Sequence, residues 1–250
     1  MKLSIVIPVF NALESLKITL QSVINNTDNL YEIILVDDYS DDPTRAFIDG
    51  LRLEDSLNCR LIKTRNPKHS WTNTSWNVGV DLASGEVIAV LNSDISVSPH
   101  WDTELIKVLQ TNTIACPCEK KPDGSIQKLD PLIEKVDPGM LKGACFMFRA
   151  KYKHDWLFPI PEALVHWCGD NYIADRANKD KGVGFSEDAI ITHGITHSGR
   201  LIDPKVYQQV CYKDVLTYQE MSGRDMSLVI EQIKPPTPSE PQHSKEFPLC

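Results

Sequence analysis

Three apolar runs in the first hundred residues each end in a cluster of carboxylate, amide or hydroxyl side chains. In chain order, these clusters are Asn11, then Asp37 with Asp38, then Asn92, Ser93 and Asp94. Short apolar runs that are rich in β-branched residues are typical of buried strands. Open α/β sheets bind their ligands at the carboxyl ends of the strands. We therefore expect the clusters to meet at one edge of a sheet and to form a site for a nucleotide and a divalent cation.

The segments that would position these clusters alternate between strand-like and helix-like patterns, as in a parallel sheet built from βαβ units. Strands are expected at residues 5–10, 31–36, 59–64 and 86–91. A helix is expected after each strand. Asn11 and Glu14 have the spacing of a capping box for the first helix. Asp41 or Asp42 is the expected cap of the second helix, and the third is expected over 72–83.

Beyond residue 114 the pattern becomes irregular, with many prolines and glycines. A further buried strand is expected over 143–148, a helix over 169–179, and mixed strand and loop over 183–197. The chain from residue 234 onward is rich in proline and polar residues, a composition that is typical of disorder.

Length and composition fit one large α/β domain of a soluble protein. The chain has 250 residues, of which 42% are hydrophobic and 24% are charged, as in ordinary globular proteins. It has no apolar stretch close to the roughly 20 residues that cross a bilayer. The amino-terminal run is too short for a secretory signal. We therefore expect a soluble, cytoplasmic protein.

The cysteines and the net charge narrow the classes of function. Seven cysteines are scattered without a C-x-x-C pair, which is typical of reduced thiols, and the spacing of Cys116 and Cys118 is poor for a zinc site. The net charge of -8 disfavours a protein that coats nucleic acid through bulk electrostatics. Basic residues within 60–69 and 142–154 could still contact a diphosphate or a polyanionic acceptor.

Taken together, segments 4–11, 36–42 and 91–94 resemble the nucleotide-sugar-binding half of family-2 glycosyltransferases, which have the GT-A fold. The likeness is close over the first hundred residues and thinner over the next hundred. It implies an α/β fold with a Rossmann-like, mostly parallel central sheet flanked by helices and a smaller acceptor-side region. On this basis we expect a nucleotide-sugar-binding half, an acceptor-binding and catalytic half of the same domain, and a disordered tail. Their expected ranges are 1–112, 113–230 and 231–250.

The resemblance also implies a metal-assisted donor site. Segment 92–94 takes the place of the family's Asp-x-Asp, with the first carboxylate replaced by the amide of Asn92. Asp94 is therefore the expected ligand of Mn²⁺ or Mg²⁺, which would bridge the donor diphosphate and assist its departure. A second ligand is expected from the histidines that flank Gly194, with His193 favoured over His197.

Further donor contacts follow from the same resemblance. Asp38 or Asp37 occupies the position that contacts the base or ribose, and residues near the end of the first strand border the base. Segment 75–79 fits the family's Ala-x-Asn-x-Gly, whereas the preceding segment, 66–70, fits poorly and is lengthened. The complete set of expected donor-binding residues is Pro8, Phe10, Asn11, Asp37, Asp38, Arg65, Asn77, Asn92, Ser93 and Asp94.

Segment 166–171 resembles the acidic motif that supplies the family's catalytic base, in a Trp-x-Gly-Asp form associated with small soluble bacterial and bacteriophage members. Asp170 is thus the expected base, taking a proton from an acceptor hydroxyl in an inverting transfer. Its structural alternative is a helix cap. Gly143 and Trp167 are the residues expected to contact the acceptor.

The favoured prediction is an enzyme that transfers a sugar from a UDP-sugar to a glycan, with inversion, in a bacterial or phage-infected cell. One alternative acceptor is a hydroxymethylated base of phage DNA, receiving a glucosyl or arabinosyl group; the two basic segments favour it and the acidic net charge opposes it. A nucleotidyltransferase is disfavoured because segment 8–12 lacks the glycine-rich phosphate loop. A non-catalytic sugar-nucleotide-binding module stays open because of the amide at Asn92.

Overall fold

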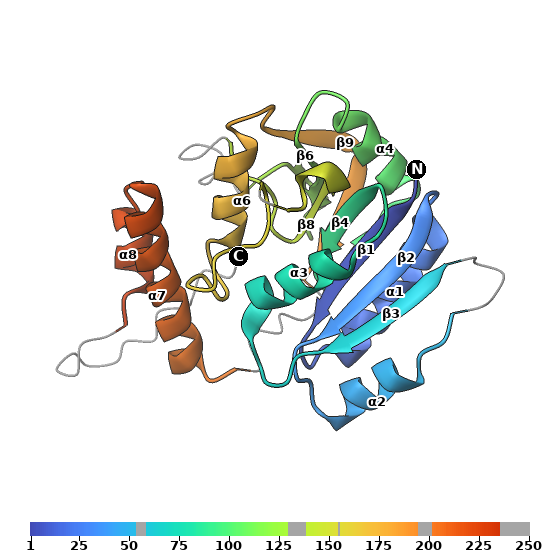
Figure 1. Ribbon diagram of the computed structural model, residues 1–250, viewed down its shortest axis with the longest axis horizontal. Helices are drawn as coiled ribbons and strands as arrows, with labels where there is room; N and C mark the ends of the chain where they lie inside the picture. The colour runs from blue at the N-terminus through green and yellow to red at the C-terminus, as the bar shows by residue number, and fades with distance from the viewer. Residues whose placement is uncertain (54–58, 130–138, 155, 195–201, 236–250) are drawn as a thin grey trace.

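The structure is a computed structural model that describes residues 1–53, 59–129, 139–154, 156–194 and 202–235. Four parallel strands form its amino-terminal half (Figure 1). They are β1 (Leu3–Val9), β2 (Leu30–Asp37), β3 (Arg60–Arg65) and β4 (Val87–Leu91), in the spatial order β3-β2-β1-β4. The sequence predicted all four, with their ends within one or two residues.

The same sheet continues beyond β4 with mixed strand directions. β8 (Cys145–Arg149) runs antiparallel to β4, and the order then continues through β6 (Ile114–Lys120), β9 (Val183–His193) and β5 (Ile95–Val97). A short strand, β7 (Ile126–Gln127), pairs with β6. The predicted α/β fold with a mostly parallel central sheet is confirmed for the half that carries the strand-end clusters. β6 lies where the sequence indicated only irregular chain.

Helices cover both faces of the sheet. They are α1 (Leu13–Asn26), α2 (Asp42–Gly50), α3 (Trp71–Leu82), α4 (Trp101–Val108), α6 (Gly169–Ala177), α7 (Pro204–Ser222) and α8 (Ser227–Ile233), with a 3-10 turn η2 (Ala150–Tyr152). In the parts of the chain that the structure describes, no helix has the length and apolar character needed to cross a bilayer. α8 contains the start of the tail expected over 231–250, and residues 236–250 lie outside the described residues.

The sheet separates two apolar clusters, which explains the continuous apolar runs of the central strands. Leu3, Ile5 and Ile7 of β1 face the cluster beneath α1 and α4. Val6 faces the opposite cluster, which also contains residues of α3, α6 and α7. Both faces of β1 are therefore buried, as expected for a parallel strand inside an α/β sheet. This packing fixes the register that brings the strand ends together.

One predicted helix cap is wrong and another is confirmed. α1 begins at Leu13, and its preceding residue, Ala12, makes no side-chain cap. Asn11 adopts a positive φ of 50°, and its Oδ1 instead accepts a hydrogen bond from the Asp41 N–H at 2.6 Å. Asp41 caps α2 as predicted by accepting from the Thr44 N–H. Asn11 thus ties the end of β1 to the start of α2 rather than capping its own helix.

Candidate functional site

The strand-end clusters lie along the carboxyl edge of the four parallel strands. Register places Val9 of β1 beside Asp37 of β2, and Asp37 beside Arg65 of β3. The backbone continues this alignment past the strands, because the Asp38 N–H donates to the Val9 carbonyl and the Asn66 N–H donates to the Asp37 carbonyl. The predicted convergence of the first two clusters is therefore a direct result of parallel pairing.

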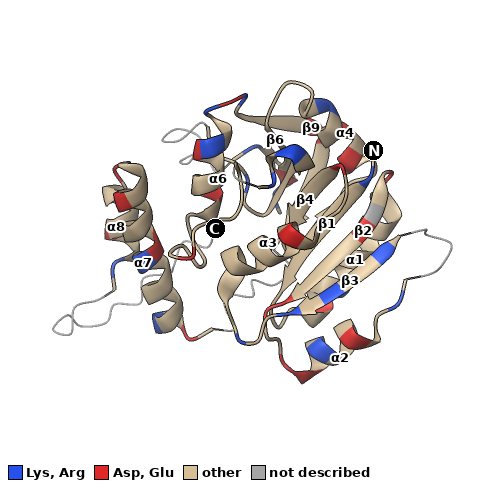
Figure 2. Ribbon diagram, in the orientation of Figure 1, with Lys and Arg blue, Asp and Glu red and all other residues tan. Residues whose placement is uncertain are grey.

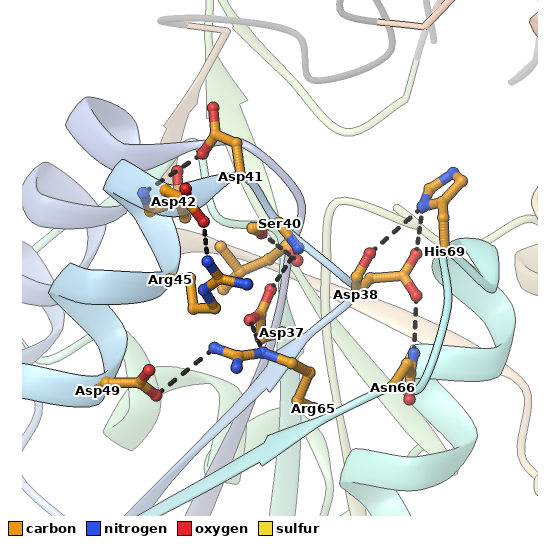
Figure 3. A network of polar contacts seen from close by, with 12 residues as sticks. Asp37, Asp38, Ser40, Asp41, Asp42, Arg45, Asp49, Arg65, Asn66 and His69 are labelled. Atoms are coloured by element: carbon orange, nitrogen blue, oxygen red, sulfur yellow. Dashed lines mark hydrogen bonds and ion pairs between the residues drawn. The ribbon is translucent and has the colours of Figure 1, made fainter.

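Asp37 is buried and bound by the protein itself. Its Oδ1 accepts from the Ser40 N–H at 2.8 Å, and its Oδ2 lies 2.5 Å from Arg65 Nε (Figure 3). The Arg65 guanidinium also reaches Asp49 at 3.5 Å. The hydrogen bond with Asp37 is the largest effect that raises the pKa of Arg65. In this structure the two residues hold the ends of β2 and β3 together, and their expected contacts with the donor stay predictions.

Asp38 is the most heavily bound carboxylate at this edge, with only 3% of the residue exposed. Oδ1 accepts from Asn66 Nδ2 at 2.7 Å and from the Ser70 N–H at 2.8 Å. Oδ2 accepts from the Trp71 N–H and pairs with His69 Nδ1, each at 2.8 Å. A carboxylate offers about four lone-pair positions, and the protein fills all of them. In this structure Asp38 holds segment 66–71, and its expected direct contact with a base or ribose stays a prediction.

Aromatic rings continue from the end of β1 across this segment to the carboxyl-terminal helices. The Phe10 ring lies 4.1 Å from the His69 ring, which lies 4.6 Å from the Trp71 ring. Trp71 is followed by His166 at 5.3 Å, and His166 by Tyr207 of α7 at 5.1 Å. We call these five rings the aromatic row. Of the row, the sequence had singled out only Phe10 as a site residue, because the other rings come from three separate segments.

Asn77 and Pro8 were also expected to contact the donor, and they lie in different parts of the structure. Asn77, on α3, donates through Nδ2 to the Ile160 carbonyl and accepts at Oδ1 from the Ile160 N–H, both at 2.8 Å. Its amide thus joins α3 to Ile160, and the expected donor contact of Asn77 stays a prediction. Pro8 is half-buried on β1, opposite Val36 of β2, and its expected place beside the base stays a prediction.

The third cluster, after β4, is joined to a histidine on β9. Asp94 Oδ1 lies 3.4 Å from His193 Nε2, and the side chains are only 10% and 13% exposed, respectively. Ser93 is buried and Asn92 is half-buried beside them. The pairing of β5 with β9 places Ile95 opposite His193, which explains the approach. The two expected metal ligands, 99 positions apart in the sequence, are therefore neighbours, while His197 lies outside the described residues.

The donor set fits a cation that shares its coordination with substrate oxygens. No group of three or more His, Cys, Asp or Glu side chains within the described ranges could hold a metal ion by itself. Asp94 and His193 supply one carboxylate and one imidazole. Mg²⁺ is commonly held by one or two carboxylates together with substrate phosphates, and Mn²⁺ also accepts carboxylate oxygens. The pair is therefore suited to a metal-bound diphosphate.

The expected base lies at the same end of β4. Leu91 pairs with Cys145 of β8, and the Asn92 N–H donates to the Ala144 carbonyl at 3.0 Å. Gly143 precedes that carbonyl, and a Cβ atom at this position would lie 2.8 Å from Asp170 Oδ2. Asp170 is the second residue of α6. The N-cap position of this helix is occupied by Cys168, so Asp170 is not the N-cap residue. The structure thus brings Asp170 and Gly143 together beside the third cluster.

Asp214, which the sequence analysis missed, holds the loop that leads to Asp170. It projects from α7, is fully buried, and accepts from three consecutive backbone N–H groups of the loop. Burial is the largest influence on its carboxyl and raises its pKa, whereas these N–H groups lower it. Asn73 of α3 holds the other side by donating to the Leu164 and Trp167 carbonyls. No local signal marks Asp214, because its partners lie nearly fifty residues earlier in the chain.

Trp167 lies within this loop, between Asp214 and the aromatic row. Its backbone N–H donates to Asp214 at 2.8 Å, and its indole Nε1 donates to the Tyr207 hydroxyl at 3.4 Å. The ring is half-buried. Trp167 and Gly143 are the two residues expected to contact the acceptor. Trp167 lies three residues before Asp170 in the sequence, and Gly143 contacts Asp170 in the folded structure.

The chain is similar in sequence to known glycosyltransferases. The family model described as glycosyl transferase family 2 matches residues 4–186. An uncharacterised glycosyltransferase of Nostoc is 31% identical over 114 residues, which are 46% of this chain and 34% of that protein. Polypeptide N-acetylgalactosaminyltransferase 11 of Xenopus tropicalis is 33% identical over 166 residues, which are 64% of this chain and 26% of that protein. The chain thus spans about a third or less of the length of these relatives.

Solved structures show the same fold. GalNAc-T7, crystallised with UDP, GalNAc and Mn²⁺, aligns with a TM-score of 0.64 at 16% identity, covering 92% of this chain and 54% of that one. TarS 1-349 of S. aureus, in complex with UDP-GlcNAc, aligns with a TM-score of 0.63 at 16% identity, covering 93% and 70%. These likenesses confirm the GT-A type of α/β architecture. Because the family model covers most of the chain, this protein belongs to glycosyltransferase family 2.

Proposed function

We propose that this protein transfers a sugar from a nucleotide-diphosphate sugar, with a UDP-sugar favoured, to a hydroxyl of a glycan, with inversion at the anomeric carbon. The observation that carries the proposal is the meeting of two groups at the end of β4. Asp94 and His193 form one group, and Asp170 with Gly143 forms the other. The first group suits the donor diphosphate and the second suits the acceptor. A transfer in a single displacement requires donor and acceptor to be bound side by side.

The donor would lie along the carboxyl edge, with its base near Phe10 and its diphosphate near Asp94. Asp94 and His193 would hold Mn²⁺ or Mg²⁺, with Asn92 and Ser93 beside them. When bound, the cation neutralises charge on the leaving diphosphate. A UDP donor is supported by two structural neighbours: GalNAc-T7 was crystallised with UDP, and TarS 1-349 in complex with UDP-GlcNAc.

Asp170 would act as the base in this proposal. It lies in the first turn of α6, where the helix dipole favours the ionised carboxylate. Gly143 has no side chain, so the Asp170 carboxylate can lie directly against the backbone at this position, where it would meet the acceptor hydroxyl. The hydroxyl proton would pass to Asp170 as the acceptor oxygen attacks the anomeric carbon. Trp167 would contact the acceptor through its half-buried ring.

The test uses labelled nucleotide sugars with glycan fragments, in the presence of Mn²⁺. The wild-type protein should transfer label, and D170N should lose transfer while it binds UDP with unchanged affinity. D123N, in an exposed turn of the described chain, serves as the control. Ordinary turnover by D170N would remove Asp170 from the role of base. Label on hydroxymethylated DNA but not on glycan would reassign the acceptor.

A further inference from the structure

The acceptor capacity of Asp38 is exhausted by the protein, which raises the question of which atom contacts the donor base at this position. Its four partners come from segment 66–71. A base could reach Asp38 only by displacing one of these partners. Two of them are backbone N–H groups at the start of α3, which would then lose their acceptor.

His69 is the one partner of Asp38 that has a second polar atom on the opposite side of its ring. A carboxylate only accepts hydrogen bonds, so Nδ1 of His69 must carry the proton that Asp38 receives. In the neutral ring, Nε2 is then an acceptor. Figure 3 shows Nε2 directed away from Asp38. Asp38 therefore fixes both the orientation and the tautomer of His69.

The Nε2 atom of His69 is buried and has no hydrogen-bond partner among the described residues. Buried polar atoms without partners are rare in folded proteins, and a water, an ion or a ligand can complete the bond. Asn73 Oδ1, Trp76 Nε1 and Trp156 Nε1 are in the same state among the described residues, but His69 Nε2 is the one that lies beside the end of β1. The ring lies against Phe10 and near Trp71, while 26% of the side chain stays exposed. Nε2 itself is covered in this structure, so a ligand must move the neighbouring side chains to reach it. An acceptor beside aromatic rings is suited to a planar heterocycle with one N–H donor.

We infer that His69, held by Asp38, reads the donor base by accepting a hydrogen bond at Nε2 from the imide N3–H of a uracil-type base. The inference rests on the proposed function and identifies the atom that sets its base preference. Cytosine carries an acceptor at N3 and cannot make this bond, so the arrangement selects uracil over cytosine. Asp38 is then a positioning residue, and Phe10 supplies a surface against which the base packs.

The experiment compares the binding of UDP and N3-methyl-UDP by calorimetry, with Mn²⁺ present. Two variants separate the functions of the His69 ring. H69N keeps a donor close to the Nδ1 position for Asp38 but has no acceptor at the Nε2 position. H69Q places an amide carbonyl close to the Nε2 position. H100N changes an exposed histidine on the amino-terminal side of α4 and serves as the control.

The wild-type protein, H69Q and H100N should bind UDP at least tenfold more tightly than N3-methyl-UDP, and H69N should bind both equally. A tenfold preference retained in H69N would overturn the inference, because another atom would be reading N3–H. Should H69N not fold, loss of the preference in H69Q would overturn it equally. A wild-type protein that binds both ligands alike also overturns it, and the proposed function then stands. A wild-type protein that binds no nucleotide contradicts the proposed function itself.

Discussion

Gly143 and Asp170 are in such close contact that a side chain at position 143 would have no room. A Cβ atom at position 143 would lie 2.8 Å from Asp170 Oδ2 and 3.3 Å from its Cβ and Cγ atoms. Gly143 comes from the segment before β8 and Asp170 from α6, so this contact fixes the distance between the two segments beside the end of β4. The position of the proposed base therefore depends on the absence of a side chain at residue 143.

Replacing Gly143 by alanine should displace the Asp170 carboxylate. We expect G143A to lower kcat for transfer by about 100-fold, because a misplacement of about 1 Å at a reacting group costs that much. UDP affinity should be unchanged. G50A is the matched control, since a Cβ at position 50 meets no atom within 4 Å. Wild-type kcat in G143A would show that Asp170 does not act from this position.

Replacing Asp94 by asparagine should weaken the response to metal. The amide oxygen carries no charge, so we expect D94N to need at least about tenfold more Mn²⁺ for half-maximal transfer. Transfer is measured across a Mn²⁺ titration, and removal of the metal by EDTA should abolish it in the wild type. D188N, an exposed carboxylate on the same strand as His193, should titrate like the wild type. An unchanged Mn²⁺ requirement in D94N would contradict the assignment.

Asp214 and Asp203 allow a comparison of two carboxylates that bind backbone N–H groups. D203A removes the exposed cap of α7 and should lower the free energy of unfolding by about 1 kcal/mol. D214A leaves the buried N–H groups of residues 165–167 without an acceptor and should cost about 3 kcal/mol. Urea denaturation gives both values. Equal effects would mean that the loop finds other partners.

His166 should make stability depend on pH. Burial is the main cause that lowers its pKa to about 4. The folded protein therefore favours the neutral ring, and the unfolded chain takes up a proton first as the pH falls. The resulting stability is present above pH 6.5 and is lost as the pH falls toward 4.

The measurement compares the wild type with H166F, which keeps a ring in the aromatic row. Between pH 7 and pH 5, the wild type should lose about 2 kcal/mol more unfolding free energy than H166F. Urea denaturation at the two pH values provides the comparison. Equal losses in the two proteins would assign the pH dependence to other groups.

Part of the site could be read from local sequence. The strands that end at or just before Asn11, Asp37 and Asp94 were predicted because strands that are buried on both faces have continuous apolar sequences. The helix after Asp41 was predicted because its cap bond spans only three residues. Parallel pairing then leaves the strand ends little freedom, so the edge at which the clusters meet also follows from the pattern. The charge distribution agrees, with acidic residues at several of these ends (Figure 2).

Tertiary structure alone decided what each polar group binds. The sequence marked Asp38 as a ligand contact, yet all its acceptor positions are filled by segment 66–71. It left Asp214 and the aromatic row unmarked. The reason is physical: strand formation depends on burial patterns that repeat over a few residues, whereas hydrogen-bond capacity is shared among groups that meet only when the chain has folded. The chain's pattern determined where the site lies, and packing between distant segments determined which of its side chains can still meet a substrate.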